Sequence, residues 1–297
     1  MDPSALNWVA FGFAAALAST AVPLVQEHHK ADGFGIAVWA KVTVVALSLP
    51  FVLMSGVPDN FAFYVAIIIS SLLWCVSDVV YFRAVPEAGA GVISRLLPIS
   101  VIFAFPLWFV FDPDLLTDYL TRPWQLGMLC AILGLATFFA MQMKKCPVSL
   151  KALRLIWFVI FAAMVGPLID KLTLGYAPAK QAPVAFMCIQ GAFMILFWGI
   201  FALLRKPVTP AIFFAPVTVK AGLMIGAAAA LVIYFNMQAL ALCDHPALLS
   251  VVLKTDALWI LLYYKAAGRK DDSNVWAGLG IVACAILLVL VKSFVVF

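Results

Sequence analysis

The chain has 297 residues, of which 66% are hydrophobic and 11% are charged, less than half of the about 25% charged residues usual in a soluble domain. So few polar side chains cannot cover a water-soluble fold, which excludes a soluble globular protein. The net charge of +5 is spread between apolar stretches and forms no single basic face, so we expect no binding of nucleic acid. These features predict an integral membrane protein surrounded by membrane lipid.

Apolar stretches about as long as a bilayer crossing recur along the chain. We find ten, at about residues 6–26, 35–55, 61–83, 88–111, 124–143, 152–170, 182–204, 217–242, 246–266 and 274–295. Each is expected to form one transmembrane helix, and the first is interpreted as a retained helix because no basic residues precede it. The breaks at 85–87 and 243–246 are very short, which predicts tight helical hairpins there.

No polar segment longer than about fifteen residues separates these stretches, which leaves no room for a catalytic domain outside the membrane. The sequence contains no HExxH, Walker A or GxSxG motif, and its six cysteines lack the spacing of metal ligands. We therefore expect no enzymatic activity, no metal site and no cofactor.

The ten stretches divide into two sets of five at a basic segment, residues 144–154. Tyr81 and Phe82 precede the fourth stretch, and Tyr234 and Phe235 hold the corresponding place before the ninth. We interpret residues 1–147 and 148–297 as two copies of a five-helix repeat within one transport unit. Because five crossings are an odd number, the copies have opposite orientations. The expected fold is an all-α membrane protein of ten transmembrane helices in two inverted repeats, with a site near the midplane.

Lysine and arginine are concentrated in the segments that follow the odd-numbered stretches, including residues 144–154. The positive-inside rule therefore predicts that this midpoint segment is cytoplasmic and that both termini lie outside. We expect the membrane to be the plasma (inner) membrane.

Several short motifs are similar to those of a transporter family. Lys41 lies early in the second stretch, residues 91–98 read Gly-Val-Ile-Ser-Arg-Leu-Leu-Pro after the short break, and Gly127 and Gly134 lie in the fifth stretch. With the two sets of five helices, these features resemble the EamA branch of the drug/metabolite transporter superfamily. The second half differs in that Gln190 stands near the position that Lys41 takes in the first.

The resemblance covers nearly the whole chain and implies a solute carrier that works by alternating access. It also implies a central cavity lined mainly by the third, fourth, eighth and ninth helices. It implies no particular substrate, because the superfamily carries amino acids, sugars, nucleotide sugars, phosphorylated sugars and lipophilic cations.

Two cations lie inside apolar stretches, where a charged group needs a partner or a wet cavity. Arg95 is in the fourth stretch on a small, polar face, and Lys254 is in the ninth with Ser250 one turn before it. In the alignment of the halves, Lys254 falls opposite Pro98, one turn from Arg95. The two cations could bind a carboxylate or phosphate of a substrate. Alternatively, each is neutralised by a nearby acid or carbonyl and fixes only the helix register.

Asp78 lies in the third stretch between Trp74 at i−4 and Tyr81 at i+3, on one helical face. It could bind an amine or a proton of a substrate, or form a structural salt bridge with Arg95 or Lys254. Asp256 is about 200° around the helix from Lys254, so we expect it to pair with a neighbouring helix.

Tyr234 and Gln238 share a face of the eighth stretch and could line the cavity or serve as packing residues. Lys41 is close enough to a helix end for its side chain to reach the membrane surface.

Since the sequence has no ATP-binding motif, these residues predict a secondary active or exchange transporter, coupled to protons or a counter-substrate. We expect the substrate to be a small polar metabolite bearing an anionic group: an organic acid, an amino acid or a phosphorylated metabolite. The alternatives are an exporter of drugs or amphipathic cations and, in other classes, a lipid flippase or membrane-embedded enzyme, or a non-transporting receptor or assembly scaffold.

Overall fold

The computed structural model describes residues 4–88, 93, 96–97, 99–142, 150–268 and 275–293, and every regular element in these ranges is a helix. In chain order the helices are α1 (Ser4–Ser19), α2 (Ala21–His29), α3 (Gly33–Ser55), α4 (Phe61–Ala88), α6 (Ile99–Phe111), α7 (Pro113–Thr121), α8 (Pro123–Gln142), α9 (Leu150–Gly175), α10 (Ala182–Arg205), α11 (Pro210–Phe213), α12 (Pro216–Leu242), α13 (Pro246–Leu253), α14 (Asp256–Ala266) and α15 (Val275–Ser293).

Seven helical segments in the described part of the chain are long and apolar enough to cross a membrane, so the protein is an α-helical membrane protein. They are Asn7–His29, Gly33–Ser55, Phe61–Glu87, Leu153–Gly175, Ala182–Arg205, Pro216–Leu242 and Pro246–Ala266. Helices α6 and α7 would make an eighth crossing if taken as one span, but they meet at 107°. Helices α8 and α15, of 20 and 19 residues, contain the apolar segments Pro123–Phe139 and Trp276–Leu288 within the part of the chain that the structure describes. Ten crossings therefore remain a prediction.

All ten predicted apolar stretches overlap helices, but two of the stretches are interrupted where the sequence gave no expectation of a break. The first divides between α1 and α2 at Thr20, and the ninth divides between α13 and α14 at Lys254 and Thr255. At the second interruption the Thr255 hydroxyl donates to the carbonyl of Val252 (2.7 Å), and the Lys254 amide donates to Ser250 (3.1 Å). These bonds satisfy backbone groups that a broken helix would otherwise leave unpaired in the membrane.

The predicted break at residues 85–87 is wrong, because α4 continues through Pro86 to Ala88. Proline has no amide hydrogen, so it cannot donate to the carbonyl four residues earlier, which belongs to Phe82. In this fold the buried side chain of Gln26 donates to that carbonyl (Nε2–O 2.8 Å). The partner from α2 compensates for the missing helical bond, and the helix continues to Ala88.

Helix α7 was not predicted, and its first residues explain the sharp bend after α6. Asp112 accepts a hydrogen bond from the amide of Leu115 (3.1 Å), and Pro113 is the first residue of the helix. An aspartate cap followed by proline is a strong signal for a helix start. The chain therefore leaves the direction of α6 and starts a new helix.

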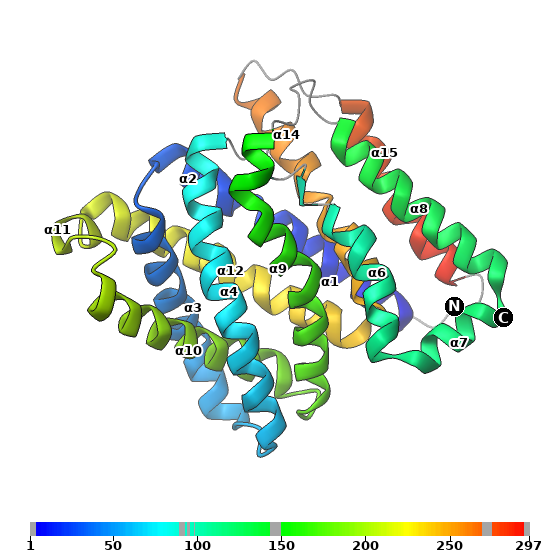
Figure 1. Ribbon diagram of the computed structural model, residues 1–297, viewed down its shortest axis with the longest axis horizontal. Helices are drawn as coiled ribbons and strands as arrows, with labels where there is room; N and C mark the ends of the chain where they lie inside the picture. The colour runs from blue at the N-terminus through cyan, green and yellow to red at the C-terminus, as the bar shows by residue number, and fades with distance from the viewer. Residues whose placement is uncertain are drawn as a thin grey trace.

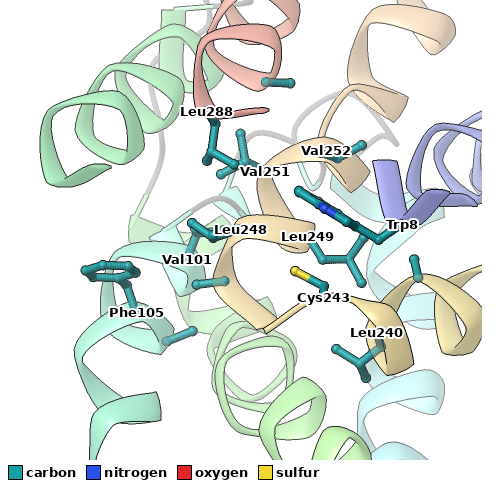
Figure 2. Packing of buried hydrophobic residues seen from close by; sticks show 14 of the residues in the cluster. Trp8, Val101, Phe105, Leu240, Cys243, Leu248, Leu249, Val251, Val252 and Leu288 are labelled. Carbon is teal, nitrogen blue, oxygen red and sulfur yellow. The ribbon is translucent and has the colours of Figure 1, made fainter. Parts of the chain in front are cut away.

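The short helix α13 lies at the centre of the largest apolar cluster. Figure 2 shows its side chains Leu248, Leu249, Val251 and Val252 pointing outward among residues of the surrounding helices. Among these neighbours are Trp8 of α1, Val101 and Phe105 of α6, Leu240 of α12 and Leu288 of α15. Side chains Pro246 to Val252 are all buried, so α13 is held on every side.

The remaining helices form a bundle, with one pair at its edge (Figure 1). Helix α12 packs against α1 and α3, α4 packs against α9, and α3 packs against α10. Helices α8 and α15 lie side by side at one edge. The ammonium of Lys171 on α9 donates to the carbonyls of Leu240 (2.8 Å) and Cys243 (2.6 Å), which joins α9 to the end of α12.

Candidate functional site

A cavity of about 270 Å³ lies among the packed helices, between α3, α4, α9, α10 and α12. Ser19 of α1, Val22 of α2 and Asp256 of α14 complete its wall. The volume is at the lower end of the range for small-molecule sites. It can hold a small metabolite but no macromolecular ligand.

Lys41 of α3 and Asp78 of α4 form an ion pair across the cavity wall, with Nζ 3.3 Å from Oδ2. The side chains are only 11% and 24% exposed, so the lysine ammonium is held inside the protein beside the carboxylate. The expectation that Lys41 extends to the membrane surface is therefore wrong. The described partner of Asp78 is Lys41, whereas the sequence had suggested Arg95 or Lys254.

Asp170 of α9 is a second carboxylate on the cavity wall, and it is buried. One oxygen accepts a hydrogen bond from the Ser70 hydroxyl (2.6 Å), and the other accepts from the Trp74 indole (3.2 Å). Ser70 in turn accepts from the side-chain amide of Gln190 on α10 (2.8 Å). The carboxylate is therefore fixed by a network that joins α4, α9 and α10.

The position of Trp74 in this network depends on a glycine. A Cβ atom at Gly166 would come within 2.5 Å of the Trp74 ring, so the indole lies directly on the backbone of α9. This close approach holds the indole nitrogen at the carboxylate of Asp170, one turn further along the same helix.

Asp256 is the third carboxylate at the cavity, and it begins α14 just after the interruption in the ninth stretch. One oxygen accepts from the Ser19 hydroxyl of α1 (3.4 Å), as expected for a contact with a neighbouring helix. The other oxygen, Oδ1, is buried and has no hydrogen-bond partner among the described residues, although the charge of Lys254 acts on the same carboxylate. It is therefore available to a donor that enters the cavity.

The charged residues of the described cavity wall are three carboxylates, Asp78, Asp170 and Asp256, and one cation, Lys41. Acidic groups therefore outnumber basic groups on the described wall. Aromatic side chains of Trp74, Tyr81, Phe82 and Phe186 form much of the remaining wall. Carboxylates beside aromatic faces are suited to a cationic group.

The eight residues proposed from the sequence divide into three groups in the structure. Asp78, Trp74 and Tyr81 line the cavity, whereas Tyr234, Gln238, Ser250 and Lys254 are not among its lining residues. Tyr234 packs near a small cluster of Val44, Met187 and Ala230, and the Ser250 hydroxyl donates to Pro246 within α13. Arg95 lies outside the residues that the structure describes.

Sequence reasoning missed Asp170 and gave no role to Gln190. The sixth apolar stretch was expected to end at residue 170, so Asp170 was taken as its boundary, but α9 continues to Gly175. A signal was present for Gln190, since it stands near the place in the second half that Lys41 takes in the first. Both side chains lie on the cavity wall.

Comparison with other proteins supports the fold alone. No protein-family model matches the sequence, and no curated protein matches it. Fifteen chains of known structure match the fold. One of them, a crystal structure of another protein, superposes with a TM-score of 0.65 and 16% sequence identity over 97% of this chain and 96% of that one. The arrangement of helices therefore occurs in a solved structure of almost the same extent.

Proposed function

We propose that the protein is a secondary transporter built from two inverted five-helix repeats, whose cavity takes a small solute bearing an amine or another cationic group. The observation that carries this proposal is the excess of carboxylates over cations on the described wall of an aromatic-lined cavity between the two halves.

The packing of the helices supports the inverted repeat. Helix α1 packs on α12 as α9 packs on α4, and α3 packs on α12 as α10 packs on α4. If α1 is exchanged with α9, α3 with α10 and α4 with α12, each contact turns into the contact with which it is compared. A twofold axis between the halves also requires contacts between equivalent helices of the two halves. Such contacts are present: α3 packs on α10, α6 on α13, and α8 on α15. Such exchange symmetry is expected of an inverted-repeat transporter with a site between the halves.

The lining residues favour an amine over the anionic group predicted from the sequence. That prediction depended on Arg95 and Lys254, of which the first lies outside the described residues and the second is not among the lining residues. Asp256 offers an unpartnered oxygen, and the Lys41–Asp78 pair can exchange partners with a charged solute. In our proposal Asp256 and Asp78 bind the amine, while Trp74 and Tyr81 pack against the rest of the solute.

The experiment is a two-step measurement on purified protein. A thermal-shift screen against organic amines, quaternary ammonium ions, carboxylates and phosphorylated metabolites identifies ligands, because a bound ligand raises the melting temperature. The best ligand is then used for exchange in proteoliposomes. We expect stabilisation by small organic amines and quaternary ammonium ions.

Matched variants test the role of the carboxylates. Asp256→Asn removes one negative charge from the cavity wall. It should weaken binding of the cation by about tenfold or more, the effect of losing a charged hydrogen-bond partner. Asp114→Asn is the control, because Asp114 is exposed in the first turn of α7. Stabilisation and exchange restricted to carboxylates or phosphates, with no effect of Asp256→Asn, would contradict the amine proposal and favour the anionic one. Absence of exchange with every stabilising ligand would contradict transport.

A further inference from the structure

A second, larger hollow lies on the outer face of the bundle, between α4 and α10, with the start of α3 at one end. It encloses about 390 Å³. Apart from Arg83, its wall is apolar, and its lining residues are Phe34, Leu72, Cys75, Val76, Val79, Val80, Arg83, Phe197, Trp198 and Phe201. We call this hollow the α4–α10 groove.

The residues that α4 contributes to the groove form one continuous stripe. From Leu72 through Cys75, Val76, Val79 and Val80 to Arg83, the spacing is three or four residues, so all lie on the same helical face. At about 1.5 Å per residue, the stripe is about 17 Å long. The hydrocarbon of a single leaflet is about 15 Å thick, half of the membrane core. The stripe therefore spans about one leaflet and ends in a cation.

The floor of the groove is fixed by contacts between α4 and α10. The indole of Trp198 donates to the carbonyl of Cys75 (3.2 Å), and this tryptophan is buried. Phe34 packs edge-on against Trp198 and lies 6.1 Å from Phe201 between ring centroids. Leu72, Val76 and Phe201 are exposed at the rim. The groove is thus preformed in the protein and open to the side.

Arg83 stands at the end of the stripe, and its side chain is exposed. Its backbone abuts α3, where a Cβ at Gly33 would lie 3.0 Å from the Arg83 amide nitrogen. No carboxylate among the described residues forms an ion pair with Arg83. Arg205, one turn beyond Phe201 on α10, is also exposed near the end of its helix. The Arg83 guanidinium is therefore available to an anion at the level where the apolar groove ends.

We propose that the α4–α10 groove binds one anionic phospholipid, with an acyl chain along the stripe and its phosphate on Arg83. The other donors on the wall, the Trp198 indole and the Cys75 thiol, already bond to the backbone carbonyls of Cys75 and Met194, so a polar metabolite would find no free donor along the groove apart from Arg83. An alkyl chain needs none. Arginine binds phosphate in a bidentate manner, and a lipid supplies the chain and the phosphate in one molecule. The proposal requires only that the helices lie in a bilayer, and it does not depend on transport.

The test is native mass spectrometry of the purified full chain with phosphatidylglycerol or phosphatidylcholine. The unmodified protein is expected to retain one phosphatidylglycerol in preference to phosphatidylcholine. Arg83→Gln should weaken the binding of phosphatidylglycerol about fivefold, which is roughly the contribution of one basic side chain at an anionic surface. Val76→Trp fills the groove and keeps the charge, so it should reduce retention of both lipids.

Lys220→Gln is the matched control, because Lys220 is an exposed cation in the first turns of α12 and does not line the groove. It should leave lipid retention unchanged. Equal retention of the two lipids by the unmodified protein would overturn the proposal. Losses of the same size in Arg83→Gln and Lys220→Gln would also overturn it, because they would indicate attraction to general surface charge. If Arg83→Gln does not fold, Val76→Trp against Lys220→Gln still decides the outcome.

Discussion

Ser70 is the smallest side chain in the cavity network, and the network depends on it most. Its hydroxyl donates to Asp170 and accepts from Gln190, so one oxygen atom connects α4, α9 and α10. We expect Ser70→Ala to lower the free energy of unfolding by about 1–3 kcal/mol, because a buried carboxylate and a buried amide would each lose a partner. Thermal unfolding in detergent measures the effect.

The adjacent serine provides the control for this prediction. The Ser71 hydroxyl is also buried, but its short bond goes to the carbonyl of Ile67 on its own helix (2.7 Å), and its contact with the carbonyl of Gln190 on α10 is longer (3.4 Å). Both carbonyls belong to helical ladders. Ser71→Ala should therefore change the melting temperature much less than Ser70→Ala. Equal losses of melting temperature in the two variants would mean that stability depends on the packing of the serine side chains and not on the hydrogen-bond network.

The Lys41–Asp78 pair gives a second prediction at the scale of residues. Breaking a buried pair costs about 3–5 kcal/mol because one charge is left uncompensated, and we expect less here since the Asp78 side chain is 24% exposed. Lys41→Gln and Asp78→Asn should each lower the free energy of unfolding of the protein, and the double variant should recover much of that loss of stability. A double-mutant cycle of melting curves measures the coupling energy. A strictly additive double variant would show that the two charges do not stabilise each other.

The sequence predicted part of this site for a clear reason. Trp74, Asp78 and Tyr81 share a helical face, and that relation is local, so spacing alone predicted that they would act together. The pairing of Lys41 with Asp78 and the network of Asp170 depend on how α3, α4 and α9 approach one another. Spacing along one helix contains no information about these contacts.

At the scale of elements, two glycines of α12 determine how closely it packs on α3. Gly222 and Gly226 are one turn apart. A Cβ at Gly222 would lie 2.3 Å from Cβ of Trp39, and one at Gly226 would lie 2.6 Å from the carbonyl oxygen of Ala40. The two helices therefore meet backbone to backbone, as in other small-residue contacts between membrane helices.

Gly226→Ala is expected to destabilise the protein by about 1–3 kcal/mol, because the neighbouring atom is backbone and cannot rotate away. The control is Gly199→Ala in α10, where a Cβ would meet nothing within 4 Å. There the higher helix propensity of alanine should leave stability unchanged or slightly higher. Melting temperatures of the two variants in the same detergent make the comparison. A neutral Gly226→Ala would contradict the close packing of α12 on α3.

Element positions were well predicted from apolarity, whereas the breaks in the elements were not. A continuous apolar run indicates which residues avoid water, and all ten runs overlap helices. Where the backbone leaves or keeps the helix depends on hydrogen bonds made by distant residues. Gln26 donates to the α4 carbonyl that Pro86 leaves without a helical partner, and Asp112 caps the start of α7. The first of these effects requires α2 to lie beside α4, which no local pattern reveals.

At the scale of the whole molecule, the proposed inverted repeat makes a prediction about sidedness. With α3 and α10 as single crossings of opposite direction, residues 30 and 206 should lie on one side, and residues 60 and 180 should lie on the other. Single cysteines at these four exposed positions, in a background without the native cysteines, can be labelled with an impermeant maleimide. The positive-inside rule expects the side of residues 30 and 206 to be cytoplasmic.

Labelling before and after permeabilisation provides the control within each variant. If residues 60 and 206 were labelled from the same side, then α3 and α10 would not be antiparallel and the inverted repeat would be wrong. If the pairs separate as expected but the side is reversed, only the orientation from charge would need correction. Lys171 directly follows the sixth apolar stretch, and its ammonium binds the end of α12, so part of the charge pattern between the stretches is structural.

The interruption between α13 and α14 has a mechanical consequence. Helix α13 is surrounded by the apolar cluster, whereas α14 begins beyond a turn in which bonds to the third residue back, such as Thr255 amide to Val252 carbonyl, interrupt the regular backbone ladder. A swing of α14 about this point would carry Asp256 with it and leave the core around α13 intact. The fixed helix and the helix that can turn are thus parts of a single apolar stretch, and the carboxylate that faces the cavity belongs to the first residue of the second helix.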